Sequence, residues 1–407
     1  MAIKNYVGNA LAVQQVSTLT PGGTIAIGDT FTATMNGKSI NFVTTDTTVA
    51  TAINGLQQLW ASLPAQIYPE FAEVIPTLNN STSPTALVLT SIVADFPFVV
   101  TSSTTTSASA TLTEATTTAA TGPSDLSNTA NWSTGALPAS GDTVNVILPN
   151  ATLYYNDNDS GVTLAALNII GNINIGLPRI NPNGYLEYRP LYWQISATLL
   201  YCNTTGNLIA INTGTIQTTI TVDGTGPGIN SPGFCWLGAN SSNIIYRNGG
   251  TIGVAFNPAE TVTCSAIYLG GTGNQDTSNS EIGAGVTVAT INQSGGVVDV
   301  YCSATSVYRT GGTMNIMGNL SLAFGTLGNY TDSFNWTAPG TITALTANVA
   351  ITSVGHAPKT ITNGSILDPD AFPLDPNKTI TYTNAVSIPP AGLNLVQVGF
   401  GRTVLVS

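Results

Sequence analysis

Apolar and polar residues alternate along most of this chain, in short runs that follow glycine. The run SGGVVDV begins at Ser294, and the similar run TGGTMNI begins a short distance later at Thr310. Each combines a Gly-Gly turn with the two-residue period of a β-strand. Related runs carry glycines at Gly214, Gly250, Gly296, Gly312, Gly340 and Gly364. The pattern predicts successive rungs of a β-helix, roughly twenty residues each with insertions, and a β-sandwich or jelly roll is the structural alternative.

The pattern differs in the first third of the chain. The segment DTFTATMNGKSINFVTT reads as two alternating strands joined at Asn36-Gly37, a strong signal for a two-residue hairpin. After it, apolar residues fall at helical spacing from Val49 to Trp60, and Asp46 or Thr47 can cap the start. This is the one helix that the sequence predicts.

Together these patterns predict a mainly β protein, with a small N-terminal α+β domain followed by a β-helix. We expect an N-terminal arm (1–20), a small α+β docking domain (21–120), a linker and β-helix cap (121–150), and a β-helix with C-terminal strands (151–407). In the linker, Trp132 precedes a Gly- and Pro-containing turn with Pro138, and Asp142 precedes the next strand. Solenoids need atypical ends that cover their exposed edges, so these three residues are the predicted cap.

Composition narrows the range of partners. Only 7% of residues are charged and the net charge is −11, whereas an ordinary soluble domain has roughly 25% charged residues. No Lys or Arg lies between Lys38 and Arg179, so phosphate neutralisation is not possible there and nucleic-acid binding is not expected. No apolar stretch approaches the roughly 18 residues that span a bilayer. The N-terminal segment lacks the apolar core of a signal peptide, so we expect synthesis in a cytoplasm without export and no membrane association.

Several segments resemble a known class of proteins. The segments GDTFTATMNGKSINFVTT, PEFAEV and FPFVVT are similar to a small module of phage tail, spike and other virion surface proteins. The segments TAATGPSDLSNTANWSTGALPASGDTVNV and GLPRINPNGYLEYRPLYWQI resemble largely uncharacterised phage-type proteins with this module ahead of a Gly/Thr-rich β-helix. The resemblance covers about three quarters of the chain.

This resemblance implies a structural virion protein made in the host cytoplasm, arranged as a side-by-side homotrimer. Its partners would be further copies of itself and the major capsid protein or tail proteins. We expect a capsid decoration or cement protein. The alternatives are a tailspike that recognises, and cleaves or only binds, host polysaccharide, and a bacterial surface adhesin.

The densest aromatic stretch is GYLEYRPLYWQ, which holds Tyr185, Tyr188, Arg189, Tyr192 and Trp193. Tyr, Trp and Arg are enriched at protein interfaces, and aromatic faces can also stack on sugars. The same residues could equally fill a wide first rung, so interface and core remain open.

No catalytic residue, metal ligand or cofactor is predicted. Glycoside hydrolysis needs two facing carboxylates, and the candidates Glu187, Asp223, Glu260, Glu281 and Asp299 show no recognisable spacing. The single histidine, His356, has no nucleophile-elbow motif to serve. The segment NDND at 156–159 offers oxygen ligands but reads as a polar turn. The four separated cysteines, Cys202, Cys235, Cys264 and Cys302, read as buried thiols, with disulfides as the lesser alternative.

Overall fold

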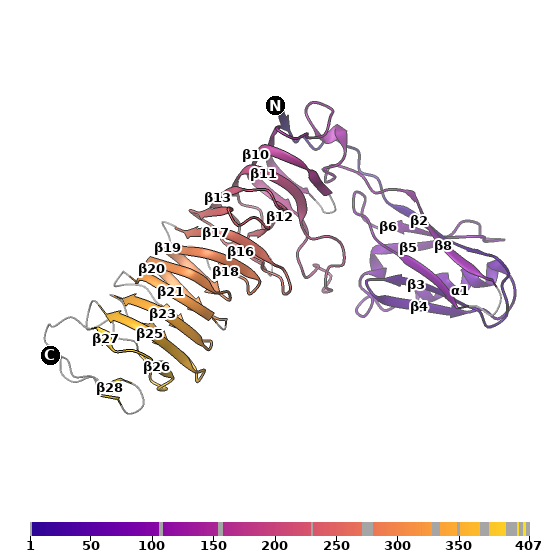
Figure 1. Ribbon diagram of the computed structural model, residues 1–407. Helices are drawn as coiled ribbons and strands as arrows, with labels where there is room; N and C mark the ends of the chain where they lie inside the picture. Colours follow the sequence, from indigo (N-terminus) through magenta and orange to yellow (C-terminus); the bar gives the residue numbers. More distant parts are fainter. Residues whose placement is uncertain are drawn as a thin grey trace.

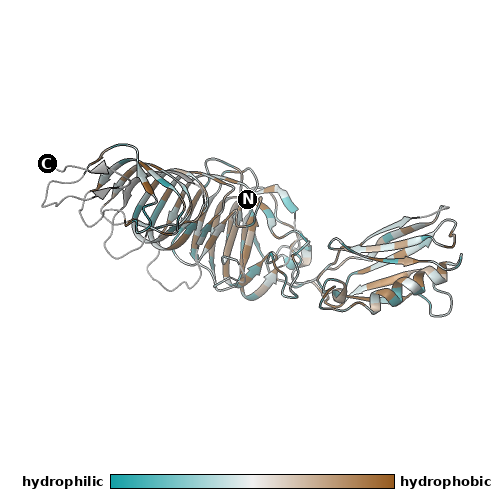
Figure 2. Ribbon diagram, turned by 90° about the horizontal axis from the view of Figure 1, so that it is seen from below, coloured by the Kyte–Doolittle hydropathy of each residue, from teal (hydrophilic) through white to brown (hydrophobic). Residues whose placement is uncertain are grey.

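The protein consists of a small α+β domain and a β-helix that meet at an angle (Figure 1). The structure is a computed structural model, and it describes residues 2–105, 109–153, 158–228, 231–270, 280–318, 320–327, 334–347, 351–366, 374–387, 397–398 and 402–403. Apolar and polar residues alternate along the strands of both parts (Figure 2). The predicted fold class, a mainly β protein with a small N-terminal α+β domain followed by a β-helix, is confirmed by the order and pairing of its strands.

The small domain contains two antiparallel sheets, with strand orders β5-β6-β2-β8 and β4-β3-β7, and helix α1 contacts strands of both. Its core holds Phe31, Leu56, Trp60 and Phe71. The elements are β2 (Val16–Gly22), β3 (Thr30–Met35), β4 (Lys38–Val43), α1 (Val49–Ala61), β5 (Val74–Leu78), β6 (Leu87–Ser91), β7 (Thr101–Thr105) and β8 (Thr111–Thr118), with a 3-10 turn at Phe71–Glu73.

Two local predictions in this domain hold. Asn36 and Gly37 both adopt positive φ, 48° and 70°, and join β3 to β4 as a two-residue hairpin turn requires. The predicted helix is present, but its N-cap is Thr48, whose Oγ1 accepts a hydrogen bond from the Thr51 N–H at 3.2 Å. Asp46 supports this cap from outside, because its Oδ1 accepts from the Thr48 N–H at 2.8 Å.

The β-helix is built from parallel strands, each paired with the strand one coil later. In Figure 1 the colours pass in order from magenta to yellow along its axis, so successive coils lie side by side. Its strands are β1 (Ile3–Asn5), β9 (Thr143–Leu153), β10 (Asn158–Ile175), β11 (Trp193–Thr204), β12 (Ile209–Asn212), β13 (Thr219–Gly224), β14 (Phe234–Leu237), β15 (Ile244–Arg247), β16 (Ile252–Val254), β17 (Val262–Leu269), β18 (Ser280–Ile282), β19 (Val286–Val300), β20 (Ala304–Ile316), β21 (Leu320–Leu327), β22 (Phe334–Trp336), β23 (Gly340–Ala347), β24 (Ile351–Ser353), β25 (Lys359–Ile366), β26 (Ile380–Tyr382) and β27 (Val386–Ser387). A separate antiparallel pair, β28 (Gln397–Val398) and β29 (Arg402–Thr403), follows.

The two Gly-Gly runs lie on successive coils, as their spacing predicts. Val297 pairs with Thr313, the residue at the same place in the second run. Coil length varies elsewhere, because Thr219 pairs with Ile244, which lies much further along the chain. The second glycines have positive φ, 72° at Gly296 and 82° at Gly312.

These corners also make room for buried polar side chains. A Cβ on Gly296 would overlap the guanidinium of Arg247, which is 3% exposed. Arg247 lies in register with Leu269, Gln293 and the fully buried Arg309 along the inside of the coils. The second glycine of each run is therefore favoured by packing as well as by turn geometry, because a Cβ on Gly312 would overlap the Gly296 carbonyl oxygen.

Residues 1–20, expected as an arm, are placed differently. β1 is the first strand of the β-helix and pairs in parallel with β9, with Ile3 opposite Thr143. The chain then leaves, forms the small domain from Val16 onward, and returns beside itself through the bridges Tyr6–Trp132 and Val13–Thr121. The small domain is thus inserted between the first two strands of the β-helix, which a local sequence pattern does not reveal.

Candidate functional site

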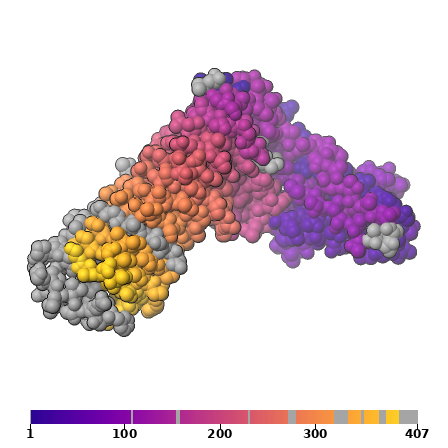
Figure 3. Space-filling view, viewed as in Figure 1, coloured from indigo at the N-terminus to yellow at the C-terminus, as the bar shows by residue number. Residues whose placement is uncertain are grey.

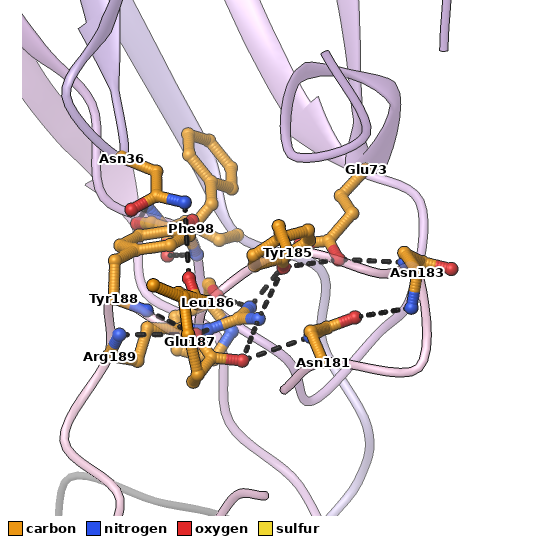
Figure 4. Close-up of polar contacts among 12 residues, drawn as sticks. Asn36, Glu73, Phe98, Asn181, Asn183, Tyr185, Leu186, Glu187, Tyr188 and Arg189 are labelled. Atoms are coloured by element: carbon orange, nitrogen blue, oxygen red, sulfur yellow. Dashed lines mark hydrogen bonds and ion pairs between the residues drawn. The ribbon is translucent and has the colours of Figure 1, made fainter. Parts of the chain in front are cut away.

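The loop between β10 and β11 carries the aromatic stretch and reaches the small domain (Figure 4). Leu186 accepts a hydrogen bond at its carbonyl oxygen from Asn36 Nδ2 at 3.1 Å. Asn183 Nδ2 donates to Glu73 Oε1 at 3.0 Å. The loop therefore joins the β-helix to the small domain by side-chain and backbone contacts.

Arg189 lies at the centre of this contact and is only 3% exposed. Its guanidinium binds Glu187 in a bidentate way, with Nε–Oε1 at 2.7 Å and Nη2–Oε2 at 2.8 Å. It also reaches two groups of the small domain, Glu73 Oε2 at 3.4 Å and the Pro97 carbonyl oxygen at 3.0 Å. The Phe96 ring lies beneath it, 4.0 Å from Cζ to the ring centroid. One cation thus connects both parts of the chain.

Tyr185 completes the network. Its hydroxyl donates to Glu73 Oε1 at 2.6 Å and accepts from Arg189 Nη2 at 2.8 Å. Burial and the hydrogen bond to Glu73 raise the pKa of Tyr185 far above its ordinary value, so it remains a neutral donor. We name this cluster of Glu73, Tyr185, Glu187 and Arg189, with Asn181 and Asn183, the junction network.

The charge of Arg189 keeps the buried Glu187 carboxylate ionised. Burial raises the pKa of Glu187, but the hydrogen bonds and charge of Arg189 outweigh burial and leave that pKa below its usual range. Charge-assisted bidentate pairs of this kind are the strongest hydrogen bonds in proteins. These contacts hold the charged side chains of Glu187 and Arg189 in fixed positions. Such an arrangement suits a structural role in joining the two parts of the chain better than it suits proton transfer.

The predicted interface residues divide into two places. Tyr185, Tyr188 and Arg189 lie between the two parts of the same chain. Tyr192 and Trp193 belong to the β-helix: Tyr192 donates to Glu260 Oε2 at 3.0 Å, and Trp193 donates from Nε1 to Asp159 Oδ2 at 3.0 Å. Trp193 is 1% exposed within the core. The stretch is thus an internal interface and core, not an exposed aromatic surface.

The partner that sequence reasoning missed is Glu73. It lies 116 residues before Arg189, in a 3-10 turn that precedes β5. It stands in the segment PEFAEV, but no local pattern indicated that its carboxylate is needed at a domain junction.

Beside the junction network lies a cleft of about 510 Å³ between the small domain and the β-helix. The small domain contributes residues 91–93 and 96–98, and the β-helix contributes residues around Asn174, Pro178 and Asn207. Figure 3 shows the two parts meeting at an angle in the region that contains this junction.

Two of the five candidate carboxylates are brought together. Glu281 of β18 pairs in register with Asp299 of β19, so the two side chains lie on neighbouring strands of one face. Burial and the Asp299 charge raise the pKa of Glu281 to about 7. Asn315 on the next coil donates to Asp299 Oδ1 at 2.7 Å. Burial and the neighbouring carboxylate thus favour the protonated form of Glu281.

The other candidate carboxylates are engaged elsewhere. Glu187 belongs to the junction network. Glu260 accepts from Tyr192 and from the Asn257 amide at 2.8 Å, and Asp223 accepts from Asn248 at 2.6 Å. Among the described strands, none of these three residues pairs in register with Glu281 or Asp299.

The predicted cap lies at the first coil. Trp132 is 2% exposed, packs edge-on against Tyr6 at 5.1 Å between ring centroids, and joins the β-helix core. Pro138 is buried. Asp142 accepts hydrogen bonds from the Ala2 N–H at 2.7 Å and the Ala139 N–H at 3.1 Å, which lower its pKa. These contacts pin the first strand to the rest of the coil.

Exposed tyrosines form a row along one face of the β-helix. Tyr201, Tyr246, Tyr268 and Tyr308 occupy one register position, with Thr221 and Asn292 between them. The rings of Tyr246 and Tyr268 stack at 4.8 Å with an interplanar angle of 10°. No residue of this register row is itself charged, and the hydroxyl of Tyr201 at one end of the row hydrogen-bonds to the carboxylate of Asp223. We name this surface the tyrosine face.

Among the described residues, no group of three or more His, Cys, Asp or Glu side chains could hold a metal ion. Asn156 and Asp157 of the NDND segment lie outside the described residues. The four cysteines are unbridged and buried, and burial raises the pKa of each thiol. His356 lies on an exposed turn.

Comparisons with known proteins add no assignment. No family model, no curated protein and no solved structure matches the chain. Within the described residues, no helix has the length and apolar character needed to cross a bilayer.

Proposed function

We propose that this protein is a structural component of a bacteriophage particle, displayed on the surface as a capsid decoration or cement protein. The observation that supports this best is the junction network, in which buried Arg189 ties the β-helix to Glu73 of the small domain. The antiparallel bridges Tyr6–Trp132 and Val13–Thr121 hold together the two chain segments that connect the small domain to the β-helix, and so constrain the same junction. A fixed angle between a docking domain and a β-helix suits a part that must fit a lattice.

The protein acts as a homotrimer in this proposal, with major capsid or tail proteins as its outside partners. The tyrosine face is the surface best suited to contact other copies. Each copy carries a net charge of −11, so copies repel one another except where uncharged surfaces meet. The stacked Tyr246 and Tyr268 rings form a paired aromatic surface, and Tyr is enriched at protein interfaces.

The oligomeric state has a direct test. Native mass spectrometry should give three chains for the wild-type protein and a monomer for Tyr268→Glu, which places a charge on the contact. Ile75→Glu is the control, because Ile75 is 47% exposed on the small domain and Tyr268 is 38% exposed on the tyrosine face. A trimer that persists in Tyr268→Glu removes this face from the proposal.

Placement on the particle is tested by electron cryo-microscopy of intact virions. Density repeated over the capsid lattice supports decoration. Density restricted to the tail contradicts it and supports a spike.

The tailspike alternative is favoured by one observation, the paired Glu281 and Asp299. A carboxyl group with a pKa of about 7 beside a second acidic side chain is the kind of pair from which a glycosidase draws its acid and its nucleophile or base. A reducing-end assay on host capsular polysaccharide, with Glu281→Gln and Asp299→Asn, tests it. Cleavage that both substitutions abolish supports the spike, and polysaccharide that stays intact with the wild-type protein refutes catalysis.

A further inference from the structure

The cleft between the two parts has walls of different chemistry. On the β-helix side, Thr152 and Asn174 lie in register on β9 and β10, and Asn207 follows on the next coil. On the small-domain side, Ile92, Val93 and Phe96 face it. Its volume of about 510 Å³ falls within the roughly 300–1,000 Å³ of small-ligand sites.

The β-helix wall offers hydrogen-bonding groups. Asn174 Oδ1 accepts from the Asn207 and Leu208 N–H groups at 2.6 and 3.2 Å, which fixes the amide in place. Its Nδ2 makes only a long contact of 3.4 Å with Thr152 Oγ1. The side-chain amide of Asn207 has no hydrogen-bond partner among the described residues, so it can donate to and accept from a ligand.

The opposite wall is apolar and exposed. Ile92 and Val93 are 51% and 54% exposed, so this wall presents aliphatic side chains to the cleft. Phe96 is held by Arg189 against one ring face. The wall is therefore a fixed apolar surface opposite a row of amides and hydroxyls.

Charge is nearly absent from the cleft. Among its lining residues the one charged side chain is Glu73. Its carboxylate already accepts from Tyr185 and Asn183 and pairs with Arg189. No cation lines the cleft among the described residues to attract an acidic ligand.

We propose that this cleft binds a neutral carbohydrate. A pyranose ring has an apolar C–H face, which suits Ile92 and Val93, and hydroxyl groups that both donate and accept, which suit Asn207 and Thr152. An apolar peptide fits less well, because it would leave the amides of the β-helix wall buried without partners at a cost of about 1–3 kcal/mol each. Uronates and sialylated glycans are disfavoured by Glu73. The inference does not depend on where the protein sits in a particle.

The test uses the full chain in isothermal titration calorimetry against neutral oligosaccharides of glucose, mannose, galactose and N-acetylglucosamine, with oligogalacturonate as the charged probe. Val93→Trp fills the cleft and should weaken binding at least about tenfold, equivalent to about 1.4 kcal/mol. Val43→Trp is the matched control, because Val43 has the same 54% exposure on β4 and does not line the cleft.

Asn207→Ala provides a second variant, which removes the amide without adding bulk. A neutral oligosaccharide that binds the wild type and Val43→Trp, but binds Val93→Trp and Asn207→Ala weakly, supports the site. The proposal is overturned if no neutral oligosaccharide binds saturably, if oligogalacturonate binds more tightly, or if Val93→Trp and Asn207→Ala both bind as the wild type does. These outcomes are independent of the particle location and the oligomeric state.

Discussion

Replacing Arg189 by methionine tests whether the junction network fixes the two parts. Methionine keeps much of the apolar stem but removes the guanidinium, so Glu187 keeps a buried carboxylate without its bidentate partner. Breaking a buried ion pair by removing one partner costs about 3–5 kcal/mol. The same substitution also removes the hydrogen bonds that Arg189 donates to Pro97 and Tyr185. We therefore expect the free energy of unfolding to fall by about 3–5 kcal/mol.

The assay is equilibrium urea unfolding followed by tryptophan fluorescence, with Arg179→Met as the matched control. Arg179 lies in the same loop but is exposed, and exposed substitutions usually change stability by about 0.5 kcal/mol or less. The double variant Arg189→Met/Glu187→Met should recover most of the loss, because it removes the stranded charge as well. Equal stability of Arg189→Met and Arg179→Met would refute the reasoning.

The same pair sets a pH dependence. The pKa of Glu187 is lower in the folded protein than in the unfolded chain, so its stabilising contribution is present above the unfolded value of roughly 4.3 and is lost as pH falls through the folded value. In Arg189→Met this loss of stability at acid pH should disappear, because Glu187 no longer has the partner that lowers its pKa.

Small-angle X-ray scattering of the same variant should show a broader range of angles between the two parts, whereas wild type and Arg179→Met should agree.

Three further predictions concern the β-helix. Glu281 has its folded pKa raised to about 7, so wild type should lose melting temperature relative to Glu281→Gln as pH rises from about 5 to about 8, and an unchanged difference would contradict the carboxyl pair. Gly312→Ala should destabilise the protein far more than Gly355→Ala in thermal unfolding, because both have positive φ, 82° and 76°, but only at Gly312 would a Cβ overlap the backbone of the preceding coil, at the Gly296 carbonyl oxygen; equal losses would mean that φ alone matters. Trp132→Ala should cost about 3–5 kcal/mol and promote aggregation detectable by light scattering, because it uncovers the first coil; a monodisperse, stable variant would show that Trp132 is not a cap.

Local patterns in the sequence were enough for several elements. The hairpin at Asn36-Gly37 and the helix from Val49 follow from φ preferences and from apolar spacing, which act within a few residues. The repeated Gly-Gly motif predicted that SGGVVDV and TGGTMNI lie on successive coils, and the two runs do pair in register. The aromatic stretch is the densest in the sequence, but its residue types suit an interface and a core equally well.

A mainly β protein with a small α+β domain and a β-helix could be predicted from the amino-acid sequence alone, because alternation, turn glycines and low charge are local or compositional properties. How the parts combine became visible only in the folded chain. The pairing of β1 with β9, of Arg189 with Glu73 and of Glu281 with Asp299 joins residues separated by coils or by a whole inserted domain. Coils differ in length, as the pairs Val297–Thr313 and Thr219–Ile244 show. No fixed period therefore tells which side chains meet, and the contacts arise only when the chain closes its coils around a common core.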